Sequence, residues 1–264
     1  MSTAANLLVD FEAGVLRVTL NRPDKRNALN RAMLAGLGAA FERYADDNTV
    51  RVAVLTAAGD KSFAAGGDLK ELSAIRTLQG ARKLNAEANA AFDRIRRFPV
   101  PVVAALNGTA LGGGAELAVA CDFRIASPHA GIGFVQGKLN ISTGFGGGAD
   151  LMRLVGPSRA LLLLCRSAVL SAEEARALGL IDAVAARDEP LAALVARFIE
   201  PLARQAPQVM RAFKAQAIAE RWGLARAERA AIEQRHFSLT WAHDDHWTAA
   251  DKVLARDRSQ GDGR

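Results

Sequence analysis

The stretch at residues 104–117 reads Ala-Ala-Leu-Asn-Gly-Thr-Ala-Leu-Gly-Gly-Gly-Ala-Glu-Leu, in which a glutamate follows three consecutive glycines after one intervening residue. We expect a strand to end near Leu106 and a helix to begin before Leu117, so that the glycines lie where the first helical N–H groups lack partners. Each glycine in a helix costs up to about 1 kcal/mol relative to alanine. A run of three therefore indicates that something must approach the bare backbone there. Free N–H groups at the positive end of a helix dipole suit a negative charge. Gly113 and Glu116 are three residues apart and share a helix face, so they can serve one reacting centre.

A second glycine turn lies at residues 63–72, which read Phe-Ala-Ala-Gly-Gly-Asp-Leu-Lys-Glu-Leu. The two glycines let the chain turn with exposed N–H groups, and Asp68 is placed to cap a short helix that begins at Leu69. A capped loop of this kind also occurs without any function. The pairing of two glycine turns, each preceding a helix, favours the functional interpretation.

Composition limits the class of protein. The chain has 264 residues, half of them hydrophobic, which is enough for one large core. It has no apolar run of about 18 residues and no basic, then apolar, leader at its start, so we expect a soluble cytoplasmic protein. Cys121 and Cys165 both have apolar neighbours, which predicts buried free thiols. The net charge of +6 suggests anionic partners or simply an arginine-rich surface.

Hydrophobic periodicity predicts an α/β chain. We expect a hairpin, several buried strands that alternate with helices, and a mostly helical region after residue 156. The expected strands are 7–20 (as a hairpin), 50–56, 101–106, 123–126, 131–134 and 180–184, and the main helices run from Asn30 to Tyr44, from Gln79 to Phe98, and from the second glycine cluster at 144–148. The strand, strand, helix rhythm at 7–45, 50–98 and 101–155 hints at repeated units.

Several segments resemble the crotonase, or enoyl-CoA hydratase/isomerase, family. They follow the family order and cover most of the first 185 residues: 21–29, 63–72, 107–116, 120–127 and 171–182. The resemblance implies a crotonase-like spiral of strand-strand-helix repeats over residues 1–190 and a C-terminal helical trimerisation region over residues 191–264. It also implies self-association as a homotrimer or a dimer of trimers.

The resemblance further implies an acyl-CoA substrate and a place for each part of it. The backbone N–H groups of Gly67 and Gly113 would form an oxyanion hole for the thioester, where preorganised donors stabilise an enolate. Adenine would lie near Ala64 and Ala65, beside Gly66 of the same loop. Lys25 or Arg26 would approach the CoA phosphates, and Lys252 is a further candidate for the nucleotide. No metal, redox cofactor or membrane is implied, since the sequence has neither a ligand cluster nor a dinucleotide fingerprint.

One position departs from the family pattern. Hydratases of this family hold a water between two glutamates, and Glu116 matches the first of them. An ungapped comparison places Gln136 where the second glutamate belongs, and glutamine exchanges no proton near neutral pH.

Three interpretations remain open. In the first, Glu116 alone is both base and acid of an enoyl-CoA hydratase or isomerase, and Gln136 orients water. We rank it highest because hydratases and isomerases make up the larger part of the family. In the second, the stretch 134–148 resembles the branch that decarboxylates methylmalonyl- or ethylmalonyl-CoA, which needs no water-activating pair. In the third, the chain is non-catalytic or binds RNA. Nucleic acid is disfavoured because the basic residues are scattered and lack interleaved aromatic residues.

Two further features have a functional and a plain interpretation. Leu84, Ala88 and Phe92 lie along one side of the helix expected at 79–98, where they would line either an acyl pocket or the core. Asp150 follows the second glycine cluster, and we interpret it as a first-turn carboxylate that complements the helix dipole.

Overall fold

The computed structural model describes residues 6–261, and its largest element is a six-stranded sheet. The strands lie in the order β1 (Leu7–Glu12), β2 (Val15–Leu20), β3 (Val52–Ala57), β5 (Val102–Leu106), β7 (Phe123–Ala126) and β10 (Ala183–Val184). The hairpin β1–β2 is antiparallel and every other pair is parallel. Parallel neighbours need crossover connections, which the helices supply.

A smaller sheet lies beside the first, and the chain alternates between the two sheets as it winds into a spiral. Its strands are β4 (Ser62–Ala64), β6 (Thr109–Leu111), β8 (Gly131–Gly133) and β9 (Val169–Ser171), in that order. Each successive unit places its first strand (β3, β5, β7) in the large sheet and its second strand (β4, β6, β8) in the small one. The predicted strand-strand-helix repeat is therefore confirmed.

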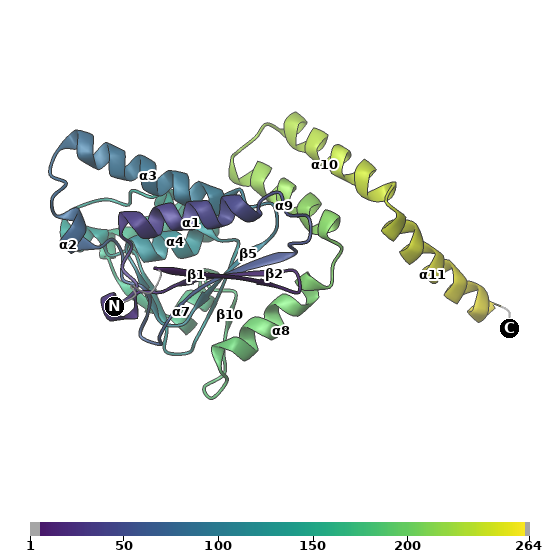
Figure 1. Ribbon diagram of the computed structural model, residues 1–264, viewed down its shortest axis with the longest axis horizontal. Helices are drawn as coiled ribbons and strands as arrows, with labels where there is room; N and C mark the ends of the chain where they lie inside the picture. The colour runs from purple at the N-terminus through teal and green to yellow at the C-terminus, as the bar shows by residue number, and fades with distance from the viewer. Residues whose placement is uncertain (1–5, 262–264) are drawn as a thin grey trace.

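Helices cover both faces of the large sheet (Figure 1). They are α1 (Arg31–Tyr44), α2 (Leu69–Leu72), α3 (Leu78–Arg96), α4 (Gly113–Ala120), α5 (Gly147–Val155), α6 (Pro157–Arg166), α7 (Ala172–Ala177), α8 (Leu191–Ala203), α9 (Pro207–Arg221), α10 (Arg226–Trp241) and α11 (Asp244–Gly261), with short 3-10 turns at Pro23–Lys25 and Gln136–Leu139. Strand residues alternate between two cores, one shared with α1, α3 and α4 and the other with α8. Helix α10 packs against α9, and α11 extends away from this body in Figure 1.

Local signals place the helix starts as predicted. The Asn30 side chain accepts a hydrogen bond of 2.9 Å from the Met33 N–H, and the Asp68 side chain caps α2. Helix α3 begins at Leu78, one residue before the prediction, because the Thr77 hydroxyl caps it.

Two predictions were wrong. Cys165 is exposed and Cys121 alone is buried. The four leucines before Cys165 point to all sides of α6, so apolar neighbours do not reveal which face is buried. Leu161 and Leu162 are exposed too. The strand expected at 180–184 contains only Ala183 and Val184, because the N–H groups of Leu180 and Ile181 close the end of α7 on the Ala175 carbonyl.

Within residues 6–261, no helix combines the length and the apolar character needed to cross a bilayer. The expectation about a leader concerns the first residues, and positions 1–5 lie outside the described range. The boundary at residue 190 stays a prediction.

Candidate active site

A cavity of about 610 Å³ lies between the two glycine turns, α3 and the segment around residue 140. Its wall is mainly apolar, with a few polar groups. The lining residues include Leu69, Leu72, Ile75, Leu78, Ala81, Leu84, Val135, Leu139, Ile141 and Phe145, together with the polar residues Arg82, Asn85, Glu116, Gln136, Ser142 and Thr143. Such a mixture is typical of a small-molecule site. Leu84 lines the cavity, whereas Ala88 and Phe92 lie in the core.

The structure brings the two glycine turns into contact, although they are far apart in sequence. A Cβ built on Gly113 would lie 3.6 Å from the Gly67 nitrogen. Gly113 is the first residue of α4, so its N–H has no intrahelical partner. The bridge between Leu29 and Gly67 uses the Gly66 carbonyl and the Asp68 N–H, which leaves the Gly67 N–H outside that pairing.

Close approach explains why the third glycine is required. A Cβ on Gly114 would lie 2.1 Å from the carbonyl oxygen of Ala64, so no other residue allows α4 to pack on that strand. The glycine run therefore has a packing role at Gly114 and leaves bare backbone at Gly113.

Glu116 lies one turn into α4 and is almost fully buried, with 2% of its surface exposed. Its Oε2 accepts hydrogen bonds from the N–H groups of Phe145 (2.7 Å) and Gly147 (2.9 Å). Its Oε1 accepts from Gln136 Nε2 (2.8 Å) and from the Gly144 N–H (3.3 Å). Because all four partners donate, the arrangement suits a carboxylate, which only accepts.

Gln136 lies directly beside Glu116, at the start of the 3-10 turn that follows β8. Its amide nitrogen donates to the carboxylate, so its amide oxygen must point elsewhere. That Oε1 atom is buried and has no hydrogen-bond partner among the described residues. A buried acceptor without a donor is costly, so this oxygen is suited to a water or a ligand group.

The backbone donors around Glu116 come from the glycine cluster at residues 144–148, a role that was not predicted from the sequence. From residues 144–148 we predicted a helix start, and from 134–148 a resemblance to the decarboxylating branch, but not a contact with Glu116. A Cβ on Gly147 would lie 2.3 Å from Glu116 Cγ, so the loop reaches the carboxylate only because that residue is glycine. Two glycine clusters in one chain were the available signal.

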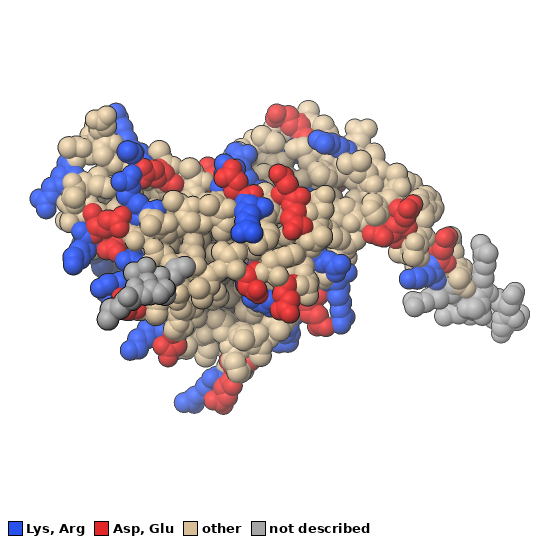
Figure 2. All heavy atoms as spheres, viewed as in Figure 1, with Lys and Arg blue, Asp and Glu red and all other residues tan. Residues whose placement is uncertain are grey.

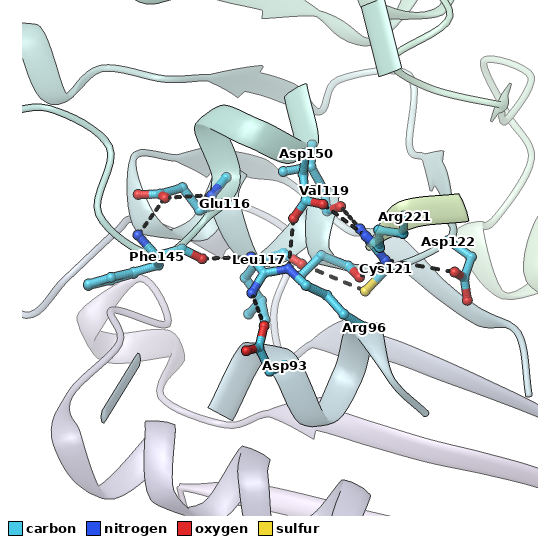
Figure 3. A network of polar contacts seen from close by, with 12 residues as sticks. Asp93, Arg96, Glu116, Leu117, Val119, Cys121, Asp122, Phe145, Asp150 and Arg221 are labelled. Carbon is cyan, nitrogen blue, oxygen red and sulfur yellow. Dashed lines mark hydrogen bonds and ion pairs between the residues drawn. The ribbon is translucent and has the colours of Figure 1, made fainter. Parts of the chain in front are cut away.

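A buried ionic network lies behind the carboxylate (Figure 3). Asp150 of α5 is paired with Arg96 of α3 (2.8 Å) and with Arg221 of α9 (2.9 Å), and it does not line the cavity. The first-turn position predicted for Asp150 is confirmed, but its two arginine partners were not predicted.

The same buried region holds Cys121, Asp122 and Lys214. Burial raises the pKa of the Cys121 thiol to about 12, so this cysteine is not a ready nucleophile. Burial also lowers the pKa of Lys214, although the neighbouring Asp122 opposes that change. Neither group belongs to the cavity wall.

The residues expected to contact CoA lie in different places. Ala65 and Gly66 line the cavity, and Ala64 is buried behind them in β4. Arg26 lines a separate hollow of about 240 Å³, and Lys25 lies in the adjacent 3-10 turn. Lys252 lies on α11, which extends away from the cavity within this chain (Figure 1).

Figure 2 shows basic and acidic side chains interspersed on the face in view. Within the described part of the chain, no group of three or more His, Cys, Asp or Glu residues is placed to hold a metal ion.

Known proteins match this chain in sequence and in fold. The family model described as enoyl-CoA hydratase/isomerase matches residues 10–254. The short-chain-enoyl-CoA hydratase of Clostridium acetobutylicum is 41% identical over 68% of each chain, and the 2,3-dehydroadipyl-CoA hydratase of Escherichia coli is 34% identical over 98% of this chain and 100% of its own. The crystal structure of an enoyl-CoA hydratase from Bacillus anthracis matches with a TM-score of 0.88 at 31% identity, over 96% of this chain and 97% of that one. The chain belongs to the enoyl-CoA hydratase/isomerase family and is an enoyl-CoA hydratase-like enzyme that processes acyl-CoA.

Proposed function

We propose that the protein adds water across the C2=C3 double bond of a 2-enoyl-CoA, with Glu116 as the single acid-base residue. The observation that carries this proposal is the buried Glu116 carboxylate, held at the cavity wall by three backbone N–H groups and Gln136. A residue held from four directions is preorganised, which is what proton transfer in a defined geometry requires.

In the proposed reaction, the thioester oxygen binds the N–H groups of Gly67 and Gly113. Glu116 takes a proton from water as the water oxygen bonds to C3. The electron pair of the double bond then moves through C2 to the thioester oxygen, where the two N–H groups stabilise the enolate. Glu116 returns its proton to C2, the enolate collapses to the thioester, and the carboxylate is regenerated. The chemistry is acid-base only and needs no metal or redox cofactor.

The two side chains supply two acceptors for the attacking water. The unpartnered Gln136 Oε1 accepts a hydrogen bond from one O–H of the water and thereby fixes the orientation of the water. Glu116 Oε1 is the oxygen that takes the proton of the other O–H, because its bond from the Gly144 N–H, at 3.3 Å, is the longest of the four. Gln136 thus supplies orientation where family hydratases have a second glutamate.

Decarboxylation of methylmalonyl- or ethylmalonyl-CoA is the second candidate. Glu116 is the only carboxylate among the described residues that line the cavity. Loss of CO₂ leaves an enolate that the same two N–H groups stabilise, and it needs no pair of groups to activate water. The names of the relatives favour hydration, and the single carboxylate favours decarboxylation.

The remaining family features are part of the same proposal. We assign Ala64, Ala65 and Gly66 to the adenine end of CoA and Lys25 or Arg26 to its phosphates. Lys252 lies on the helix that extends from the body, so it would reach a nucleotide only at a neighbouring subunit. We further propose self-association through α10 and α11, on which Phe237, Trp241 and Trp247 are each about half exposed.

The decisive experiment incubates the protein separately with crotonyl-CoA, methylmalonyl-CoA and ethylmalonyl-CoA and follows the products by mass. Gain of one water on crotonyl-CoA without CO₂ loss from the others supports the hydratase; CO₂ loss without hydration supports the decarboxylase. Glu116→Gln keeps the shape of the side chain and removes its basicity, so we expect turnover to fall about 10²–10⁴-fold. Full turnover by this variant on every substrate of the wild type would exclude the role of Glu116.

A further inference from the structure

We propose that Arg96 is a positioning residue for the reaction, which it serves by anchoring the loop whose N–H groups hold Glu116. This inference rests on the proposed role of Glu116. Arg96 does not line the cavity, and 5% of its side chain is exposed. It lies at the end of α3, close behind the loop at 144–147 (Figure 3).

Each nitrogen of the Arg96 guanidinium has its own partner. Nη2 donates to the Phe145 carbonyl oxygen at 2.6 Å, Nε donates to Asp150 at 2.8 Å, and Nη1 donates to Asp93 at 2.8 Å. The N–H of the same Phe145 residue donates to Glu116 at 2.7 Å. One residue therefore separates the arginine from the carboxylate, and its peptide groups are held on both sides.

Asp150 joins this anchor to the helix that carries Glu116. Its second oxygen accepts from Arg221 Nε, while Arg221 also donates to the carbonyls of Val119 and Ala120 at the end of α4. A cation at a helix C-terminus stabilises the helix through its free carbonyls. The loop that holds the carboxylate and the helix that bears it are thus connected through Asp150.

The backbone of the loop is shaped to admit the arginine. Gly146 has a φ of +82°, and a Cβ there would lie 2.6 Å from Arg96 Nη2. Only glycine satisfies both conditions without displacing the guanidinium. This fit is specific to a planar fork that bridges a carboxylate and a carbonyl, which the single nitrogen of lysine does not reproduce.

A purely structural role and a positioning role predict different results. A network that only stabilises the fold would alter the unfolding temperature and leave the kinetics of the folded enzyme unchanged. A positioning network would lower kcat in a folded variant while the cavity still binds the CoA thioester. A displacement of about 1 Å at a reacting group can cost about 10²-fold in rate.

The test compares Arg96→Lys with the matched control Arg94→Lys, two residues earlier on the same helix, where the exposed Arg94 is paired with Glu42. Each is assayed on the CoA thioester that the wild type turns over, and its folding is checked by near-ultraviolet circular dichroism. We expect Arg96→Lys to lose about 10²-fold in kcat with KM changed less than about threefold, and Arg94→Lys to match the wild type. A folded Arg96→Lys enzyme with wild-type kcat would overturn the inference.

Two further variants keep the result interpretable. If Arg96→Lys does not fold, Gly146→Ala replaces it, because it leaves every charge in place and pushes the loop from the guanidinium. The same separation of kcat from KM is expected, and an unchanged kcat would again overturn the inference. Glu116→Gln in the same assay separates the two proposals. If this variant retains turnover, the proposed function fails. If it is inactive while Arg96→Lys is fully active, only the positioning role of Arg96 is refuted.

Discussion

Replacing Gly147 with alanine measures how strictly the position of Glu116 controls the reaction. The added Cβ would lie 2.3 Å from Glu116 Cγ and 2.6 Å from Glu116 Cβ, whereas ordinary contact begins near 3.4 Å. Gly147 is not among the residues with positive φ, so the change introduces a steric clash without backbone strain. Either the glutamate or the loop must move by about 1 Å.

The size of the effect follows from that displacement. A shift of about 1 Å at a catalytic group costs about 10²-fold in kcat. Overpacking of a close-packed interior costs about 1–3 kcal/mol in the free energy of unfolding, so we also expect a lower melting temperature. KM should change little, because the walls of the cavity far from Glu116 are untouched.

The assay determines kcat and KM with the turned-over thioester and the melting temperature by circular dichroism. Gly38→Ala is the matched control, because Gly38 lies in α1 and its added Cβ would make an ordinary contact of 3.5 Å with Ala91 Cα of α3. There alanine should raise stability by about 0.5–1 kcal/mol and leave kcat unchanged. Wild-type kcat and melting temperature in Gly147→Ala would refute the claim that this glycine is needed for close approach.

Three further outcomes are expected from features outside the cavity. Asn30→Ala removes the cap of α1 and should lower the free energy of unfolding by about 1 kcal/mol in urea titrations; no change would show that the cap is dispensable. The hydrogen bond from Arg22 holds the pKa of the Asp68 carboxyl below its ordinary value, so the unfolded chain takes up the proton first as pH falls. Asp68→Asn should therefore melt at a lower temperature than the wild type near pH 7, and this difference should shrink as the pH falls below about 4. The wild type should elute at an apparent mass above that of its 28.0 kDa chain in size-exclusion chromatography, and Trp241→Glu should elute later than the wild type; an unchanged elution volume would show that the exposed α10 face does not mediate assembly.

Local signals were enough to predict much of the architecture. The caps at Asn30 and Asp68, the alternating strands and the glycine turns depend on neighbours within a few residues, which sequence patterns report directly. The strand-strand-helix rhythm also predicted the repeat that winds into two sheets. The burial of Cys165 was predicted wrongly, because an apolar run surrounding a helix does not define which side meets the core.

By itself, the sequence determined the repeated α/β fold, the family and the carboxylate beside the glycine run. The tertiary structure alone decided what surrounds that carboxylate. The donors at Gly144, Phe145 and Gly147 lie about 30 residues from Glu116, and Arg96 and Arg221 meet at Asp150 from helices 54 and 71 residues away. Each contact depends on how helices cross in three dimensions, and no local pattern records such a crossing. The surroundings of Glu116 therefore became visible only once the chain was folded.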